Sequence, residues 1–517
     1  MTTTPSRAQP QTQNGRAVAA VRWGGLVAGP VVAALVYALL PAGVYEQGEL
    51  VSGLSPSGRA SAAVGALMAI WWMSEAIPLA ATALLPIVLF PLTGALGLNE
   101  TTARYAHPLI FLFMGGFLLG LGMQRWNLHR RIALTTILIV GTRPRRLVGG
   151  FMVATAMLSM FVSNTATAVM LVPIAMSVIE LVDQRIGDDE RPLLAPFATA
   201  LMLSIAYAAS IGGMGTLIGS PPNTLLAGFM LERFDVRISF LGWMAAALPL
   251  VAVFLPLAWV YLVRFASPVR LETLPGGRAL IRDELRALGR MSRGEWAVFV
   301  VFCLTAAMWM TRPLLVSLGE RIGLAPLAAL TDPGIAMLGG LALFVIPVDA
   351  RSRVFAMDWE TAARLPWSVL LLFGGGLALA RAIQSGGVDV YLGSGFDALT
   401  GAPTLVIVMS VALLMIFMTE LTSNTAVTSA LLPVLAGVGL ELGIEQPLYL
   451  LLPATFAASC AFMLPVATPP NAVVFASDRV TIAQMARSGL VMNLIGVALI
   501  SLASLMLAPL LIRVSGV

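Results

Sequence analysis

Long runs of apolar residues alternate with short polar segments along almost the whole chain. A helix needs about 20 consecutive apolar residues to cross the hydrocarbon core of a bilayer. Windows that approach this length lie at residues 23–42, 60–76, 79–93, 108–124, 196–230, 240–263, 295–313, 332–348, 366–381, 447–477 and 489–512. The pattern therefore predicts an all-α polytopic membrane protein with about eleven transmembrane helices.

Two further apolar segments, residues 147–182 and 404–440, carry the same polar motif at their centres. The sequence "SNTA" occupies residues 163–166 in the first segment and 423–426 in the second. The apolar arm on either side of each motif is shorter than a comfortable bilayer crossing. Because backbone that leaves a helix at membrane depth must be covered by protein or line a polar cavity, we expect two re-entrant hairpins with these motifs at their tips.

A pair of prolines interrupts one apolar run after each hairpin. The run at 196–230 contains "GSPPN" at 219–223, and the run at 447–477 contains "ATPPN" at 467–471. Adjacent prolines remove two backbone donors and clash with the preceding turn, so a helix cannot continue straight through them. We expect both runs to be broken helices with an unwound segment at the prolines.

The second half of the chain repeats the first in a constant register. "ETTAR" at 100–104 matches "ETAAR" at 360–364, a shift of 360 − 100 = 260 residues, and the same shift aligns the two SNTA motifs. Arginines indicate the orientation, since cytoplasmic loops are enriched in basic residues. With a cytoplasmic N-terminus, the first hairpin opens from the cytoplasm and the second from outside. We therefore expect an inverted repeat, a layout common in secondary transporters.

These patterns divide the chain into five segments. Residues 1–20 are polar and are expected to form a disordered cytoplasmic N-terminus, and 21–56 the first transmembrane helix and a loop. Repeat 1 covers 57–264, a cytoplasmic loop 265–293, and repeat 2 covers 294–517. The loop is expected to contain an amphipathic surface helix around "RALIRDELRALGRM". The C-terminus is expected to lie outside the cytoplasmic (inner) membrane.

Composition narrows the range of functions. Only 11% of the 517 residues are charged and 58% are hydrophobic, whereas soluble domains are about one quarter charged. The chain has two cysteines, two separated histidines and no lysine, which disfavours a disulfide framework and a histidine-rich metal centre. Loops beside the membrane explain the arginines, so nucleic-acid binding is disfavoured, and we expect no cofactor.

Serine, threonine and asparagine at the breaks suit the binding of small ions. Their side chains cap the first N–H groups of a half-helix, while hydroxyls and free carbonyls can ligate a hard cation. Helix N-termini present unpaired N–H donors to an anion. The hairpins and broken helices contain no Arg, Lys or His, so helix termini, neutral donors and co-bound cations would have to offset the charge of a multivalent anion. Cation binding would then be a precondition for anion binding, which amounts to symport.

Glu420, beside the second SNTA motif, is the only acidic residue well inside these segments. An ionisable residue at membrane depth is a candidate for function. Two interpretations stay open: Glu420 binds a cation or a proton directly, or it pairs with structural groups.

The sequence resembles the divalent-anion/sodium symporter family, which carries dicarboxylates, citrate or sulfate. The resemblance rests on "WWMSEAIPLAATALLPIVLFPL" (71–92), "SNTATAVMLVP" (163–173), "GSPPN" (219–223), "SNTAVTSALLP" (423–433) and "ATPPN" (467–471). These motifs span nearly the whole chain after the first helix. The resemblance implies a homodimer in which each protomer has a scaffold domain and a transport domain that moves by an elevator mechanism.

The resemblance also implies which residues bind ions and substrate. The first sodium site would involve Ser159, Ser163, Asn164 and Gly219, and the second Thr419, Thr422, Asn424 and Ala467. The substrate carboxylates would meet Asn164, Thr165, Ser220, Asn424, Thr425, Thr468 and Pro469.

We therefore expect a secondary transporter that couples sodium to the uptake of a C4-dicarboxylate such as succinate or malate. Symport of sulfate, a tricarboxylate or another oxyanion stays open, as does proton-coupled transport or sodium-independent exchange of dicarboxylates. A membrane-embedded enzyme is disfavoured because the sequence shows no nucleophile–base pair or metal cluster. A channel is disfavoured because it does not explain the inverted hairpins.

Overall fold

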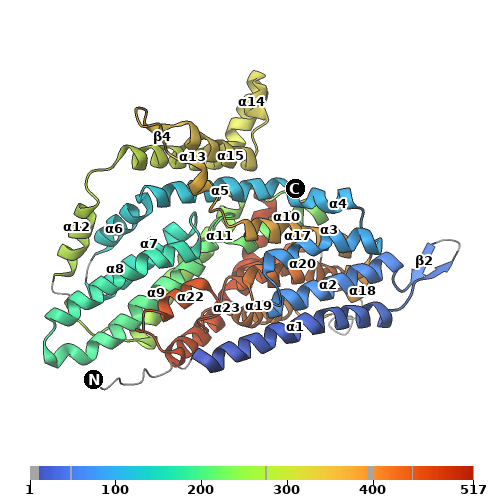
Figure 1. Cartoon of the computed structure of the whole chain (residues 1–517), viewed down its shortest axis with the longest axis horizontal. Coiled ribbons are helices and arrows are strands. Elements are labelled where there is room, and N and C mark those ends of the chain that lie inside the picture. The colour runs from blue at the N-terminus through green and yellow to red at the C-terminus, as the bar shows by residue number, and fades with distance from the viewer. Residues whose placement is uncertain are drawn as a thin grey trace, which may run out of the picture.

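Helices make up nearly all of the regular structure of this protein (Figure 1). The computed structural model describes residues 11–46, 49–141, 143–273, 276–393, 401–444 and 446–515. The helices of the first half are α1 (Gln11–Leu39), α2 (Pro56–Ser74), α3 (Leu79–Thr93), α4 (Leu98–Ala103), α5 (Pro108–Arg125), α6 (Leu128–Val140), α7 (Pro144–Ser159), α8 (Asn164–Arg185), α9 (Leu194–Gly213), α10 (Pro221–Phe234) and α11 (Phe240–Tyr261).

The second half continues with α12 (Gly277–Ala287), α13 (Arg293–Ile322), α14 (Ala325–Ala328), α15 (Asp332–Val345), α16 (Trp359–Ala362), α17 (Trp367–Ser385), α18 (Val388–Gly393), α19 (Thr404–Leu421), α20 (Asn424–Glu441), α21 (Leu448–Ala458), α22 (Pro469–Phe475) and α23 (Ile482–Ser515). Short helical turns are η1 (Arg104–Ala106), η2 (Asp188–Leu193) and η3 (Leu262–Ala266). The strands β1 (Val44–Glu46) and β2 (Glu49–Ser52) form one antiparallel hairpin, and β3 (Pro347–Asp349) and β4 (Val354–Phe355) form another.

Most of the long helices run side by side in one bundle (Figure 1). The helices α13 and α15 lie along one edge of the bundle and α1 along the opposite edge, while the β1–β2 hairpin projects at one end and α12 lies at the other (Figure 1). The hairpins and broken helices lie between these edges, where buried apolar side chains from α5 to α11 and from α17 to α23 form one continuous core.

Ten helices in the described ranges are long and apolar enough to cross a membrane. Three of them are arms of the expected hairpins, namely Asn164–Arg185, Thr404–Leu421 and Asn424–Glu441. The expectation that the hairpin arms are too short to cross a bilayer is therefore wrong for these three helices. The apolar window underestimates a helix such as α8, because the polar residues Asp183, Gln184 and Arg185 continue it beyond the window.

The first helix begins at Gln11, within the segment that was expected to be disordered up to residue 20. The extension has a simple physical reason. Adding a residue to an existing helix costs far less than starting one, and alanine, glutamine and arginine in this stretch favour helix. Residues 1–10 lie outside the described residues. The amphipathic helix expected in the loop 265–293 is present as α12.

Corresponding helices of the two halves make reciprocal contacts. Helix α5 packs on α15, and α17, which corresponds to α5 by the shift of 260 residues, packs on α3. Both contacts depend on glycine: a Cβ atom at Gly115 would lie 2.4 Å from the Ala336 carbonyl oxygen, and one at Gly375 would lie 2.4 Å from the Ala83 carbonyl oxygen. The repeat seen in the sequence is therefore also a repeat of close helix contacts.

The hairpins and broken helices also exchange partners between the halves. The hairpin arm α8 of the first half packs against α22 of the second, and the hairpin arm α20 of the second half packs against α10 of the first. Each SNTA motif thus lies at the start of a helix that contacts a proline-started helix from the other repeat. This exchange brings the polar motifs of both halves into one region of the molecule.

The glycine contacts yield a test of the fold. Gly375→Ala should destabilise the protein by about 1–3 kcal/mol, because the new methyl group overlaps the backbone of α3 and the two helices must separate. Thermal unfolding in detergent measures the change. Gly24→Ala is the matched control, since no atom lies within 4 Å of a Cβ placed there, and equal melting temperatures for the two variants would contradict the assigned contact.

Candidate functional site

The two hairpin tips are built alike. Helix α8 begins after Ser163, whose hydroxyl accepts a hydrogen bond from the Ala166 N–H at 3.3 Å and caps the helix. Helix α20 begins after Ser423, which holds the same N-cap position in extended backbone. Serine is favoured there because it replaces the partner that the first N–H groups of a helix lack. The helix breaks expected at the two motifs are therefore present.

A cluster of oxygen atoms surrounds the hydroxyl of Ser159 at the first tip. This hydroxyl lies within hydrogen-bond distance of Asn164 Oδ1 and 2.7 Å from the Ala209 carbonyl oxygen. One hydroxyl has a single proton to donate, so the cluster has more acceptors than donors. Neutral oxygens gathered in this way are the ligands that a hard cation prefers.

The second tip contains the same cluster at equivalent residues. The Thr419 hydroxyl contacts Asn424 Oδ1 and lies 2.9 Å from the Ala458 carbonyl oxygen. Thr419 and Asn424 correspond to the two side chains of the first cluster by the shift of 260 residues. The structure thus brings four of the residues expected at sodium sites into two matching pairs.

Buried glycines allow backbone carbonyls to approach the first cluster. A Cβ atom at Gly213 would lie 2.8 Å from Asn164 Oδ1 and 3.2 Å from the Gly219 carbonyl oxygen. A Cβ atom at Gly219 would lie 3.1 Å from the Met160 carbonyl oxygen. The Gly219 carbonyl group therefore lies near the Asn164 side chain, and the Met160 carbonyl group lies near Gly219.

An asparagine after the prolines holds the unwound segment between α9 and α10. The side-chain amide of Asn223 donates hydrogen bonds to the carbonyl oxygens of Gly213 at 2.9 Å and of Thr216 at 2.7 Å. These carbonyls lie where the helix has stopped, so they lack the N–H partners that a continuous helix would supply. Asn223 supplies those partners from a buried position.

Asn471 makes the equivalent contacts in the second half. Its amide donates to the carbonyl oxygens of Ala461 and Leu464, each at 3.0 Å, and all three residues correspond to the first set by one shift, 471 − 223 = 248. Among the described residues, the side-chain oxygens of Asn223 and Asn471 are buried without a hydrogen-bond partner. The sequence interpretation gave neither asparagine a role in the site, although an asparagine after each proline pair was the available signal.

The two halves meet at the starts of the broken helices. Ser220 holds the N-cap position of α10 without a side-chain cap hydrogen bond, whereas Thr468 caps α22 through its hydroxyl, which accepts from the Asn471 N–H at 3.4 Å. The Ser220 hydroxyl lies 3.2 Å from the hydroxyl of Ser459, which ends α21. Unpaired N–H groups at such helix starts can bind an anion.

The expected substrate residues differ in accessibility. Thr165 and Pro469 are exposed, whereas Ser220, Thr425 and Thr468 are buried. The exposed pair comes from α8 and α22, which pack together. The site is therefore accessible on the α8–α22 side and covered around α20.

Thr422 and Ala467, two of the residues expected at the second sodium site, donate hydrogen bonds to backbone carbonyl groups. The Thr422 hydroxyl donates to the Met418 carbonyl oxygen at 2.8 Å, within its own helix. The Ala467 N–H donates to the Leu464 carbonyl oxygen at 3.2 Å, in the unwound segment. Ala467 can therefore offer only its carbonyl oxygen to a cation, and Thr422 can offer its carbonyl oxygen or the lone pairs of its hydroxyl.

Glu420 binds the unwound segment before α22. Its carboxylate accepts hydrogen bonds from the N–H groups of Phe462 at 2.7 Å, Met463 at 2.8 Å and Leu464 at 3.1 Å, and from the side-chain amide of Asn493 at 2.7 Å. The side chain is only 3% exposed. Four donors satisfy the charge of this carboxylate, so of the two open interpretations the geometry favours pairing with structural groups.

The family follows from comparison with known proteins. The model of the sodium:sulfate symporter transmembrane region matches residues 22–514 of this chain. The chain belongs to the divalent-anion/sodium symporter family. Members of this family move ions and solutes across membranes, which agrees with a site made of helix ends and neutral oxygens.

Named relatives support this membership. This symporter is 41% identical over 487 residues to the sodium-dependent dicarboxylate transporter SdcS of Staphylococcus saprophyticus, covering 94% of this chain and 91% of the relative. It is 42% identical over 449 residues to SdcS of Staphylococcus aureus strain USA300, covering 86% and 85%.

Two solved structures share the fold at low sequence identity. The YdaH transporter of Alcanivorax borkumensis matches with a TM-score of 0.57 and 16% identity, covering 95% of this chain and 97% of that one. MtrF of Neisseria gonorrhoeae matches with a TM-score of 0.55 and 13% identity, covering 95% and 96%. These likenesses establish a transporter fold for the symporter.

The contacts of Glu420 yield a second test. Glu420→Gln should destabilise the symporter by about 1–3 kcal/mol, because the amide N–H groups that replace one oxygen face backbone N–H donors. Thermal unfolding and limited proteolysis between α21 and α22 measure the loss. Glu441→Gln, at the partly buried end of α20, is the control. A Glu420→Gln protein as stable as the wild type would contradict the structural role.

Proposed function

We propose that this symporter takes up a C4-dicarboxylate, such as succinate or malate, together with sodium. The observation that carries the proposal is the matched pair of oxygen clusters at Ser159–Asn164 and Thr419–Asn424. Both lie at the starts of interrupted helices, in segments without cationic side chains. The relatives named sodium-dependent dicarboxylate transporter support the same coupling ion and substrate class.

Sodium ions at the two clusters supply the positive charge that the site otherwise lacks. At the first site the ligands are the oxygens of Ser159, Ser163, Asn164 and Gly219. At the second site they are the oxygens of Thr419, Thr422, Asn424 and Ala467. Because a bound cation also orders the adjacent helix start, the N–H groups there face the substrate only after the ion has bound. Coupling then follows from electrostatics, since a dianion entering the empty site would meet carbonyl oxygens and partial charges only.

The substrate carboxylates bind between the two hairpin tips. One carboxylate contacts Asn164 and Thr165 of the first tip, the other Asn424 and Thr425 of the second. The helix starts at Ser220, Thr468 and Pro469 supply further polar contacts. Two symmetry-related tips suit a molecule with a negative group at each end, which is the support for a dicarboxylate over a substrate with one anionic group.

Sulfate or a tricarboxylate is the second candidate substrate. The description of the matching family model names sulfate, and a pair of serine- and asparagine-lined tips can hold any oxyanion of suitable size. Competition of these anions against labelled succinate ranks the candidates directly.

The repeat suggests how the site alternates between the two sides of the membrane. We propose that the two copies are inverted, with the N-terminus in the cytoplasm and the C-terminus outside. A transport domain of hairpins and broken helices then moves in an elevator mechanism against a scaffold within a homodimer. The reciprocal packing of α5 on α15 and of α17 on α3 supports the symmetry. Exposure of Thr165 on the α8 side suits a site open to the cytoplasm in this conformation.

Uptake into proteoliposomes tests the proposed function. An inward sodium gradient should drive accumulation of labelled succinate, and Asn164→Ala or Asn424→Ala should reduce the rate by about 100-fold, since each removes the shared ligand of ion and substrate. Asn99→Ala, exposed in the short helix α4, is the control that should leave uptake unchanged. Wild-type rates in either site variant would remove the site assignment, and uptake that needs internal substrate but ignores sodium would establish an exchanger.

Sidedness of single cysteines tests the inverted repeat. In a protein without Cys303 and Cys460, we expect Gly187→Cys, after the first hairpin, to react with an impermeant maleimide only from the cytoplasmic side. Gln446→Cys, after the second hairpin, should react only from outside. Both positions are exposed, so equal access is expected in solubilised protein. Reaction of both from one side of sealed vesicles is incompatible with inversion.

A further inference from the structure

Helix α12 has a docked face and a basic face. Gly277 and Ile281 are buried against the bundle, where α12 packs on α6 and α8. Arg278, Arg282 and Arg286 are exposed, and their spacing of four residues places them along one side of the helix. An exposed Arg290 follows just after the helix ends. The stripe formed by these four arginines, called here the arginine stripe, faces away from the protein core.

The acidic residues of α12 pair with only one arginine of the stripe. Glu284 is engaged by Arg130 of α6 at 2.5 Å, and Asp283 pairs with Arg286 at 3.2 Å. Within the part of the chain that the structure describes, Arg278, Arg282 and Arg290 have no ion-pair partner. Three guanidinium groups are thus available to an external anion.

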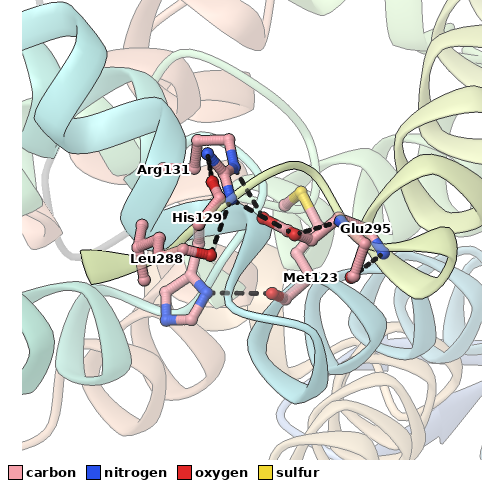
Figure 2. Close-up of polar contacts among 7 residues, drawn as sticks. Met123, His129, Arg131, Leu288 and Glu295 are labelled. Atoms are coloured by element: carbon pink, nitrogen blue, oxygen red, sulfur yellow. Dashed lines mark hydrogen bonds and ion pairs between the residues drawn. The ribbon is translucent and has the colours of Figure 1, made fainter. Parts of the chain in front are cut away.

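Arg131 of α6 holds the end of α12 in place. Arg131 of α6 donates to the carbonyl oxygen of Leu288 at 3.3 Å (Figure 2) and to that of Gly289 at 3.1 Å, just after α12. The same guanidinium pairs with Glu295 at 2.7 Å, at the start of α13 (Figure 2). The turn between α12 and α13 is therefore clamped to α6, and the arginine stripe keeps a fixed outward direction.

The position of α12 places the arginine stripe beside the membrane surface. The helix lies in the short connection between the membrane-spanning α11 and α13, at the same end of the bundle as the start of α1 (Figure 1). Arg145, at the start of α7, donates to the Val269 carbonyl oxygen at 2.9 Å, which holds the connection against the ends of the bundle helices.

We propose that the arginine stripe binds the phosphate groups of anionic phospholipids in the adjacent leaflet. Guanidinium groups form charge-assisted hydrogen bonds with phosphate oxygens, and basic residues beside a transmembrane helix are attracted to anionic lipid headgroups. A lipid surface fits better than a soluble partner because both ends of α12 are tied to helices that span the membrane. Since α12 packs on α6 and α8, the bound headgroups lie beside the ends of these two helices.

Lipid retention by the full-length protein tests this proposal. Wild type and R278Q/R282Q/R290Q are reconstituted into nanodiscs with equal parts of phosphatidylglycerol and phosphatidylcholine, and bound phosphatidylglycerol is counted by native mass spectrometry. The triple variant should bind phosphatidylglycerol about tenfold or more weakly, because each arginine near an anionic surface contributes to binding. Raising the salt concentration should weaken binding in the wild type and have little further effect in the variant.

Two matched variants separate lipid binding from other causes. R278K/R282K/R290K keeps the charge and should retain most of the bound phosphatidylglycerol. R321Q/R351Q/R364Q removes three exposed arginines elsewhere and should behave as the wild type. Equal lipid retention in the glutamine variant and the wild type would overturn the proposal, as would equal loss in the lysine and glutamine variants. Lipid retention is read without measuring transport, so the outcome does not depend on which anion is carried.

Discussion

A helix that stops inside a membrane leaves backbone groups without partners, and each such group is costly in a medium without water. Much of the central architecture of this symporter follows from satisfying those groups. Asn223 and Asn471 donate to the carbonyls that precede the two proline pairs, and Glu420 accepts from three successive N–H groups in the same unwound segment of the second half. With these partners in place, the breaks become fixed structural elements that can hold ligands.

The two repeats satisfy the backbone groups at their breaks in nearly the same way, but they differ at the residue equivalent to Glu420. In the first repeat, the position equivalent to Glu420 is Met160, since 420 − 160 = 260, and the Met160 carbonyl oxygen accepts a hydrogen bond from Thr216 in the unwound segment. A backbone carbonyl thus binds the first break where a carboxylate binds the second. Glu420 therefore stabilises the second break only, whereas both repeats contain a cluster of neutral oxygens.

Exchange of partners between the repeats makes a single site from two copies. Helices α8 and α22 pack together, as do α20 and α10, so each hairpin tip lies beside a broken helix from the other half. Outside this central region, Arg130 joins α6 to Glu284 of α12, and Arg131 joins α6 to Glu295 at the start of α13. Hydrogen bonds thus stabilise the polar centre of the symporter, and ion pairs connect α6 to α12 and to the start of α13.

The sequence by itself determined the class, the breaks and the repeat, because each depends on local properties: apolar length, paired prolines and a constant shift of 260 residues. The motifs that resemble a known family also predicted Ser159, Asn164, Thr419 and Asn424 as ligands, and the structure places them in two contacting pairs. Only the tertiary structure decided what Glu420 contacts, and that Asn223 and Asn471 hold the breaks. Those contacts join atoms of residues that are 10 or more positions apart in sequence, and Glu420 and Phe462 are 42 positions apart. A one-dimensional pattern shows which groups need partners, and the folded chain alone selects the partners.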